Sequence, residues 1–362
     1  MNAPDTLLCT PRQHLPRGEE FLFLPPWVQP YAYRIVDRLF AHRVIRRGPA
    51  PRPLPYGPEI DPRYASSGRE CDVGTFMDRN AMVGVLVIHR GRVVLERYGL
   101  GLQEHDRWST MSTVKSMTAM LVGAAVQDGA IGSIDEPLTK YLPTLAGSAY
   151  DGVSLRHVLT MSSGTHWVED YTDRTSHVNR YSKSLADRVP GGVLKLMASL
   201  ERAHPPGTTV RYNSGDTYLL GAALTRAVGM PLADYMSQKV WQRAGMALRD
   251  FGRFGLFVLN DGVIDGKRVL PEGWVDAAAT PAFKVPVSPV VDITHYGYSW
   301  WLGDGVMSAL GHSGQRIDIY RKEDLVVVTL GAFPEPAYAP PGDHNRRNEV
   351  VAFTRAVRAA LA

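Results

Sequence analysis

The sequence predicts an α+β fold, with an antiparallel sheet built from both ends of the chain and flanked by helices. Three observations support this prediction: a β-hairpin pattern at residues 82–98, helical patterns across most of 111–260, and strand patterns at 296–330 before a final helix. Since strands and helices are segregated along the chain rather than alternating, α+β is favoured. Residues from about 130 to 260 are expected to form an all-helical region inserted into the sheet domain.

The first regular elements follow from local patterns. Met82–His89 and Arg92–Tyr98 are apolar, β-branched runs joined by Arg90-Gly91, which is typical of a hairpin. A helix is expected from 111 to Gly129, and Ser154 is expected to cap a short helix. Further helices are predicted at 193–200, 217–228, 232–243 and 250–260, with a polar, irregular loop at 167–190.

The two ends of the chain differ in character. Apolar segments predict strands at 296–302, 306–310, 316–321 and 325–330, and an amphipathic pattern predicts a helix at 345–361. Residues 1–74 are interrupted by prolines and contain one short amphipathic pattern at 33–44. We therefore expect 1–74 to be an N-terminal extension that wraps a main domain at 75–362.

Composition excludes several classes of protein. The net charge is +4 and the basic residues are scattered, so nothing favours nucleic-acid binding. The chain lacks an apolar run of about 18 residues, so no membrane span is predicted. Residues 1–20 lack a signal-peptide pattern, and two cysteines exclude a disulfide framework; a cytoplasmic location is expected. The expected partners are a small-molecule substrate and, as one option, a second copy in a homodimer.

Ser112 and Lys115 form the first candidate for chemistry. They are three residues apart at the start of an apolar helical pattern, so their side chains share one helix face. A serine hydroxyl needs a base to become a nucleophile, and a lysine serves as that base when burial lowers its pKa. An S-x-x-K pattern alone is weak, and an ordinary helix turn with a solvated lysine explains it equally well.

Two further stretches strengthen this candidate. Tyr212-Asn213-Ser214 lies in a turn between helices, where a phenol beside an ammonium can relay a proton. Residues 309–315 place small residues at the end of a predicted strand, so backbone N–H groups there can face a developing oxyanion.

Other chemistries receive less support. Gly311-His312-Ser313-Gly314 resembles a nucleophile elbow, but Gln315 stands where the motif needs glycine. His166, Glu169 and Asp170 could suggest a metal-ligand cluster, yet a solvated loop is the favoured interpretation. Neither H-E-x-x-H nor C-x-x-C occurs, so no metal and no other cofactor is expected.

The three stretches, in this order and roughly 100 residues apart, resemble the serine β-lactamase and penicillin-binding-protein superfamily. Within it, residues 75–360 resemble β-lactamase-related hydrolases of the 6-aminohexanoate-dimer (nylon oligomer) hydrolase and class C-like esterase type. The resemblance implies Ser112 as the acyl-enzyme nucleophile, Lys115 as its base and Tyr212 as the proton shuttle. It also implies that Tyr171, Ser214 and Gly311 contact the substrate.

The resemblance leaves two choices for the oxyanion hole, which pairs the Ser112 N–H with one N–H of the strand. If His312-Ser313-Gly314 matches the family's triad, the second donor is Gln315. If Ala309-Leu310-Gly311 matches it, the donor is His312, and this alignment is preferred. The carboxylate-binding cation of true β-lactamases is then missing from the triad.

The expected function is therefore a serine hydrolase that cleaves small amides or esters through an acyl-enzyme on Ser112. The alternatives are a β-lactamase or D-alanyl peptidase, and a catalytically weak acyl-binding homologue. One departure bears on the last of these. After Met246 the chain passes directly to Ala247, where relatives usually carry a further loop and strand beside the active site.

Overall fold

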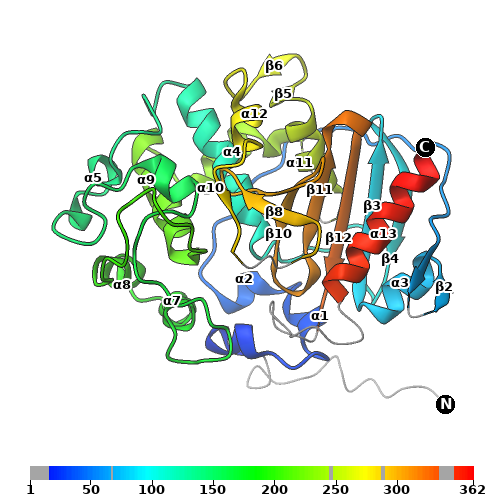
Figure 1. Cartoon of the computed structure of the whole chain (residues 1–362), viewed down its shortest axis with the longest axis horizontal. Helices are drawn as coiled ribbons and strands as arrows, with labels where there is room; N and C mark the ends of the chain where they lie inside the picture. Colours follow the sequence, from blue (N-terminus) through cyan, green and yellow to red (C-terminus); the bar gives the residue numbers. More distant parts are fainter. Residues whose placement is uncertain (1–15, 67, 244–247, 287–289, 334–345) are drawn as a thin grey trace.

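The computed structural model describes residues 16–66, 68–243, 248–286, 290–333 and 346–362. Within these residues, eight antiparallel strands form one sheet in the order β4-β3-β12-β11-β10-β9-β8-β7 (Figure 1). The strands are β3 (Met82–His89), β4 (Arg92–Tyr98), β7 (Phe283–Lys284), β8 (Ile293–Tyr296), β9 (Trp301–Gly303), β10 (Met307–Leu310), β11 (Arg316–Tyr320) and β12 (Leu325–Gly331). Because β3 pairs with β12, both ends of the chain build the sheet, as predicted.

The strand β3, second from one edge of the sheet, is buried on both faces because helices cover each side of the sheet. Leu86 and Ile88 face one core cluster, and Val85 and Val87 face the other, as the two-residue period of a strand requires. On the second face, α3 (Val73–Arg79) packs against α13 (Arg346–Leu361) under the strands (Figure 1). The Phe76 and Phe353 rings stack there with their centroids 4.1 Å apart.

The first face is covered by α11 (Leu248–Leu259), which contacts β3, β11 and β12. A Cβ atom at Gly252 would lie 2.6 Å from Leu86 Cδ2, and one at Gly255 would lie 2.5 Å from Val326 Cγ1. The two glycines share one helix face and let α11 approach the sheet closely. Thus α11, although predicted within the helical region, packs on the sheet.

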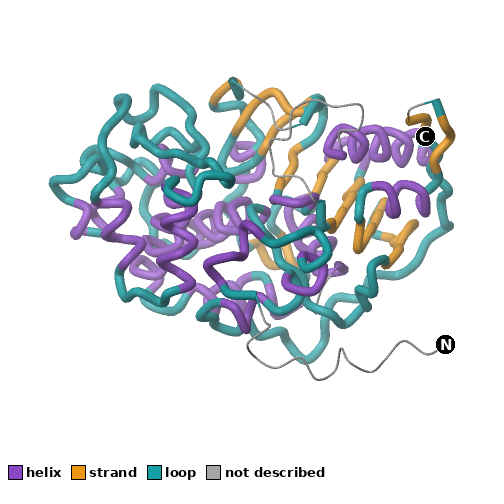
Figure 2. The backbone as a smooth tube through the Cα atoms, turned by 90° about the horizontal axis from the view of Figure 1, so that it is seen from below, coloured by secondary structure: helices purple, strands orange, loops and turns teal. Residues whose placement is uncertain are grey.

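The other helices gather to one side of the strands (Figure 2). The central one is α4 (Thr113–Gln127), which is buried on almost every side and contacts α9 (Ser214–Val228). Around this pair lie α5 (Leu138–Tyr141), α6 (Leu155–Leu159), α7 (His177–Ala186), α8 (Gly192–Ala198), α10 (Leu232–Lys239), and the 3-10 turns η4 (Pro143–Leu145) and η5 (Trp241–Arg243). The smaller remaining elements are β5 (Val263–Ile264), β6 (Lys267–Arg268), α12 (Trp274–Ala278), η6 (His312–Gly314) and η7 (Arg321–Glu323).

Three local predictions were wrong. Residues 167–190 contain the helix α7, whose amphipathic face packs inward. The strand predicted at 296–302 is split into β8 and β9, because the Ser299 N–H donates to the Leu159 carbonyl and Ser116 Oγ donates to the Ser299 carbonyl. These contacts come from α6 and α4, which are distant in sequence, so the local pattern does not reveal them.

The third wrong prediction concerns the extension. Residues 33–44 do not form one helix, because the chain is broken between α1 (Gln29–Ala32) and α2 (Val36–Leu39). The other regular elements of the extension are η3 (Gly18–Phe23), β1 (Tyr64–Ser66) and β2 (Arg69–Cys71). Isolated short helices are marginal in water, so burial of Tyr33 and Leu39 in the main core decides the local conformation. The described part of the extension thus supplies side chains to the main core. The domain boundary at 74 stays a prediction.

Within the described residues, none of the helices is long and apolar enough to cross a membrane. The predicted departure after Met246 falls at 244–247, outside the described residues.

Candidate active site

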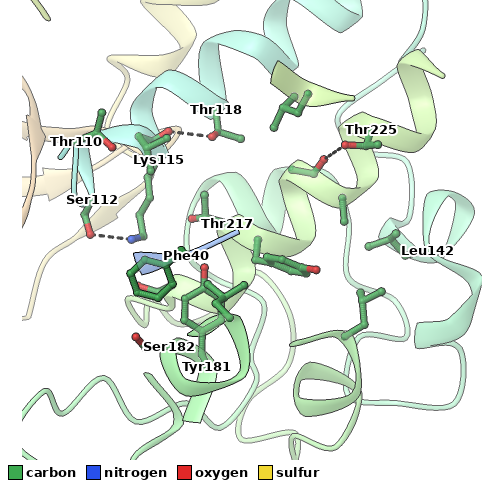
Figure 3. A pocket seen from close by; sticks show the side chains of 18 of the residues that line it. Phe40, Thr110, Ser112, Lys115, Thr118, Leu142, Tyr181, Ser182, Thr217 and Thr225 are labelled. Atoms are coloured by element: carbon green, nitrogen blue, oxygen red, sulfur yellow. Dashed lines mark hydrogen bonds between the residues drawn. The ribbon is translucent and has the colours of Figure 1, made fainter. Parts of the chain in front are cut away.

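Ser112 lies at the first turn of α4, directly after a residue with an unusual backbone conformation. Met111, directly before it, has a φ of 47°, which is uncommon for a residue with a side chain. The Ser112 hydroxyl makes no cap hydrogen bond to its own helix. Instead it accepts a hydrogen bond of 2.8 Å from Lys115 Nζ (Figure 3). The two side chains meet as the i, i+3 spacing predicted.

Lys115 is surrounded by protein. Lys115 is only 6% exposed, and burial lowers the pKa of its ammonium to about 8. The nearby Glu169 carboxylate partly offsets this effect, because its negative charge raises the pKa of Lys115. Taking an ammonium out of water disfavours its charged form. A substantial neutral fraction of Lys115 therefore exists close to neutral pH, and only the neutral amine can accept a proton.

Tyr212 faces Lys115 from the turn before α9. The Lys115 Nζ lies 4.9 Å from the centre of the Tyr212 ring, close enough for a cation–π contact. Behind it, the Trp301 ring stacks on the Tyr212 ring with a centroid distance of 5.5 Å. Asn213 caps α9 by accepting from the Asp216 N–H, which holds this turn in place. Ser112, Lys115 and Tyr212 thus come together from two helix starts.

The end of β10 approaches Ser112 at Gly311. A Cβ atom there would lie 2.9 Å from Gln315 Cβ and 3.1 Å from both Met111 Cβ and the Thr110 carbonyl oxygen, so a side chain at this position would force its neighbours to shift. The Gly311 N–H donates to the Gln315 carbonyl on the β11 side. Gly311 is extended, and successive N–H groups of a strand alternate in direction, so the N–H of the next residue, His312, is expected to point away from β11.

His312 and Gln315 occupy different surroundings. His312 lines the same cavity as Ser112, and burial lowers the pKa of its imidazole to about 4, so the ring is neutral at ordinary pH. Gln315 is buried behind the strand, where its side chain accepts from Trp108 Nε1 and donates to the Gly331 carbonyl. The side chain of Gln315 therefore ties three segments together.

Glu169 is a site residue that sequence analysis missed. Its carboxylate accepts hydrogen bonds from the Tyr171 hydroxyl, the Ser214 hydroxyl, the Ser214 N–H and Trp167 Nε1. The interpretation of this residue as part of a solvated loop was wrong, because the loop folds back onto the start of α9. A carboxylate two residues before Tyr171 was the available signal, and no local pattern showed its partners.

Tyr171 and Ser214 both line the cavity, and Glu169 fixes both. The Tyr171 ring packs edge-on against the His312 ring at 5.2 Å, so the loop after α6 meets the end of β10. Of the predicted substrate contacts, Tyr171 and Ser214 line the cavity together with Ser112, and Gly311 lies against Met111, directly before Ser112. Their contact with a substrate stays a prediction.

The extension also reaches the site. The hydroxyls of Tyr33 and Ser313 are 3.0 Å apart, and the Tyr33 ring packs edge-on against Trp108 at 5.6 Å. Ser313 in turn contacts His312 Nδ1 at 2.7 Å. This connection was not predicted, because nothing in the Pro-rich extension indicates which surface it covers.

The cavity beside Ser112 has a volume of about 1430 Å³. Figure 3 shows Ser112 and Lys115 on one side of it and Leu142 and Thr225 on the other. In the described ranges, no group of three or more His, Cys, Asp or Glu side chains is arranged to hold a metal ion.

Comparison with known proteins agrees with this fold. The Beta-lactamase family model matches residues 72–248. The 6-aminohexanoate-dimer hydrolase of Paenarthrobacter ureafaciens is 27% identical over 338 residues, covering 84% of this chain and 85% of that protein. Esterase EstB of Burkholderia gladioli is 28% identical over 193 residues, covering 48% of each chain.

Solved structures show the same architecture. A Bacillus anthracis protein, provisionally named a 6-aminohexanoate-dimer hydrolase, superposes with a TM-score of 0.81 at 19% identity over 98% of both chains. A penicillin-binding protein from Bacillus halodurans gives a TM-score of 0.61 at 17% identity, covering 79% of this chain and 99% of that one.

The fold and these matches define the class: residues 72–248 match the Beta-lactamase family, the fold is shared with β-lactamases and penicillin-binding proteins, and the chain is a serine hydrolase. Within that superfamily it is similar to the 6-aminohexanoate-dimer hydrolases and related esterases. The predicted fold class and the predicted family resemblance are confirmed.

Proposed function

We propose that this enzyme hydrolyses small amides or esters through an acyl-enzyme on Ser112. The observation that carries the proposal is the 2.8 Å contact between Ser112 Oγ and the Nζ of a buried lysine. When Lys115 is protonated it donates to Ser112; when it is neutral the direction reverses and Ser112 can give up its proton.

The reaction then has two halves. Ser112 Oγ attacks the substrate carbonyl carbon while its proton passes to Lys115, and a tetrahedral oxyanion forms. Collapse of this intermediate expels the alcohol or amine, which receives a proton from Lys115 through Tyr212. Water, activated by the same pair, then attacks the acyl-enzyme and releases the acid. The 4.9 Å separation between Lys115 Nζ and the Tyr212 ring supports a shared role in these proton transfers.

We assign the oxyanion hole to the backbone N–H groups of Ser112 and His312. The direction of the Gly311 N–H toward β11 supports His312, because the next N–H along an extended strand points the opposite way. The buried position of Gln315 behind the strand argues against the alternative alignment. Two such donors stabilise charge that exists only in the tetrahedral state.

The proposal is tested by intact-protein mass spectrometry after incubation with a fluorophosphonate probe. One label per chain is expected on wild type and none on Ser112→Ala. Ser199→Ala, which removes an exposed serine at the C-terminal cap of α8, is the matched control and is expected to be labelled. Labelling of folded Ser112→Ala, or none on wild type, would contradict the assignment.

Turnover assays separate the alternatives. Steady hydrolysis of p-nitrophenyl acetate or of 6-aminohexanoate dimer supports the proposed esterase or amidase activity. A single burst without steady state would indicate an acyl-binding homologue. Nitrocefin turnover would indicate a β-lactamase, and it is not expected, because the residues Ala309-Leu310-Gly311 carry no cation.

We further propose a cytoplasmic enzyme that forms a homodimer. The buried Cys71 has a free thiol, which suits a reducing compartment. Light scattering during size-exclusion chromatography tests the dimer, and a monomer mass at micromolar concentration would contradict it.

A further inference from the structure

The cavity at Ser112 continues well beyond the reacting groups. It follows α9 from Ser214, beside the nucleophile, to Arg226 and on to Leu232. Arg226 is twelve residues after Ser214 on the same helix, so the two positions are about 18 Å apart along its axis. An extended chain of roughly 15 bonded atoms covers that distance. The volume of about 1430 Å³ exceeds what a small acyl group requires.

The walls between these two ends are mainly apolar. They come from the extension, the helical region and the turn after α5; the apolar side chains include Phe21, Phe40, Leu142, Leu185, Leu194 and Leu232. Two of the lining hydroxyls, on Thr118 and Thr225, donate to carbonyls of their own helices (Figure 3). These two hydroxyls are therefore already used, whereas the buried Thr217 hydroxyl has no hydrogen-bond partner among the described residues. The walls are otherwise mainly apolar, which suits a hydrocarbon chain.

The charges on the lining have one sign. Among the described residues that line the cavity, the charged side chains are Lys115, Lys140 and Arg226, and no Asp or Glu occurs. Lys140 is paired with Glu136 at 2.8 Å. Arg226 is exposed and has no hydrogen-bond or ion-pair partner within the described ranges. The far end of the cavity therefore offers a guanidinium, which suits a carboxylate and repels an ammonium.

We propose that the substrate of this site carries an extended, apolar chain of roughly 15 atoms that ends in a carboxylate. The chain lies along α9 and its carboxylate contacts Arg226, while the scissile carbonyl lies at Ser112. This inference rests on the proposed acyl-enzyme chemistry and specifies the substrate class for it.

Matched esters test the chain length and the terminal charge. Two series are assayed: p-nitrophenyl alkanoates from acetate to myristate, and acetate esters of alcohols of the same lengths. In the series whose variable chain occupies the cavity, kcat/KM is expected to rise about fourfold for each added methylene group until the cavity is filled. A second set compares p-nitrophenyl dodecanoate with the ω-carboxyl and ω-amino esters of the same chain length. The ω-carboxyl ester is expected to exceed the ω-amino ester.

The variant Arg226→Gln tests whether Arg226 causes the preference for the ω-carboxyl ester. The ratio of kcat/KM for the ω-carboxyl ester to that for the neutral ester is expected to fall about threefold to fivefold, as for an exposed ion pair. Arg355→Gln removes an exposed arginine from α13 and is the control for overall charge; this ratio is expected to stay unchanged in it.

The outcomes separate this inference from the proposed function. If acetate esters are hydrolysed but both length series are flat, or if the ω-amino ester is preferred, the inference is wrong and the hydrolase proposal stands. An equal drop in Arg226→Gln and Arg355→Gln also overturns the role of Arg226. If no ester is hydrolysed and Ser112 is not labelled, both proposals fail.

Discussion

At the scale of single residues, Lys115 links the stability of the protein to its activity. Burial holds the pKa of Lys115 near 8, below its ordinary value of 10.5. Between those two pH values the folded chain binds fewer protons than the unfolded chain, so stability rises with pH there. Below about pH 8 both states are protonated, and the full cost of burying the ammonium remains.

The first prediction concerns the pH profile. For a p-nitrophenyl ester, log kcat/KM is expected to rise by about one unit per pH unit below pH 8 and to level off above it, because neutral Lys115 is the base. A profile that is flat between pH 6 and 9 would contradict this role.

The second prediction is that Lys115→Met abolishes hydrolysis yet stabilises the fold. Removal of a buried ammonium is expected to raise the free energy of unfolding at pH 7 by up to about 3 kcal/mol, measured by urea denaturation. Lys195→Met, at an exposed position on α8, is the control and is expected to change neither quantity. A destabilised Lys115→Met protein would show that contacts of Lys115 outweigh its desolvation.

The third prediction concerns Glu169, whose charge raises the pKa of Lys115. Glu169→Gln is expected to move the acid limb of the kcat/KM profile to lower pH and to reduce kcat, because Tyr171 and Ser214 lose a charged acceptor. Asp170→Asn changes the neighbouring, exposed carboxylate and is the control. An acid limb that stays in place would exclude this electrostatic coupling.

At the scale of elements, the contact between the end of β10 and the start of α4 sets the positions of the two proposed oxyanion donors. The fourth prediction is that Gly311→Ala lowers kcat about 100-fold, because the added Cβ would meet Gln315 Cβ at 2.9 Å and the turn at Thr110-Met111 at 3.1 Å and would displace the strand. The backbone at Gly311 has a φ of −127°, which alanine adopts without strain.

Gly74→Ala, in α3, is the matched control. A Cβ atom there meets only Asp72 Oδ1, at 3.6 Å, so activity is expected to stay unchanged. Wild-type kcat in Gly311→Ala would show that the strand tolerates displacement and would weaken the assignment of His312.

At the scale of the whole molecule, the extension, the sheet and the helical region share one site. The fifth prediction compares two tyrosines of the extension. Tyr33→Phe removes the contact with Ser313 and is expected to cost about 1 kcal/mol in the free energy of unfolding and to reduce kcat. Tyr31→Phe, at a residue that is 50% exposed, is expected to leave both unchanged. Equal effects in the two variants would show that the extension does not position η6.

Local patterns were sufficient for elements whose partners are near in sequence. The hairpin β3–β4 has the predicted bounds, and the contact between Ser112 and Lys115 needs only the geometry of one helix turn. The segregation of strands and helices was enough to predict the α+β class.

Only the tertiary structure decided the surroundings of these groups. Burial of Lys115, the four donors to Glu169, the split between β8 and β9 and the cavity along α9 arise from segments that are far apart in sequence. A sequence pattern reports the periodicity of one segment, whereas desolvation and cavity shape depend on which other segments pack against it. The sequence by itself therefore determined the fold class and the contact between Ser112 and Lys115, and packing decided the electrostatics around that pair and the volume of the cavity beside it.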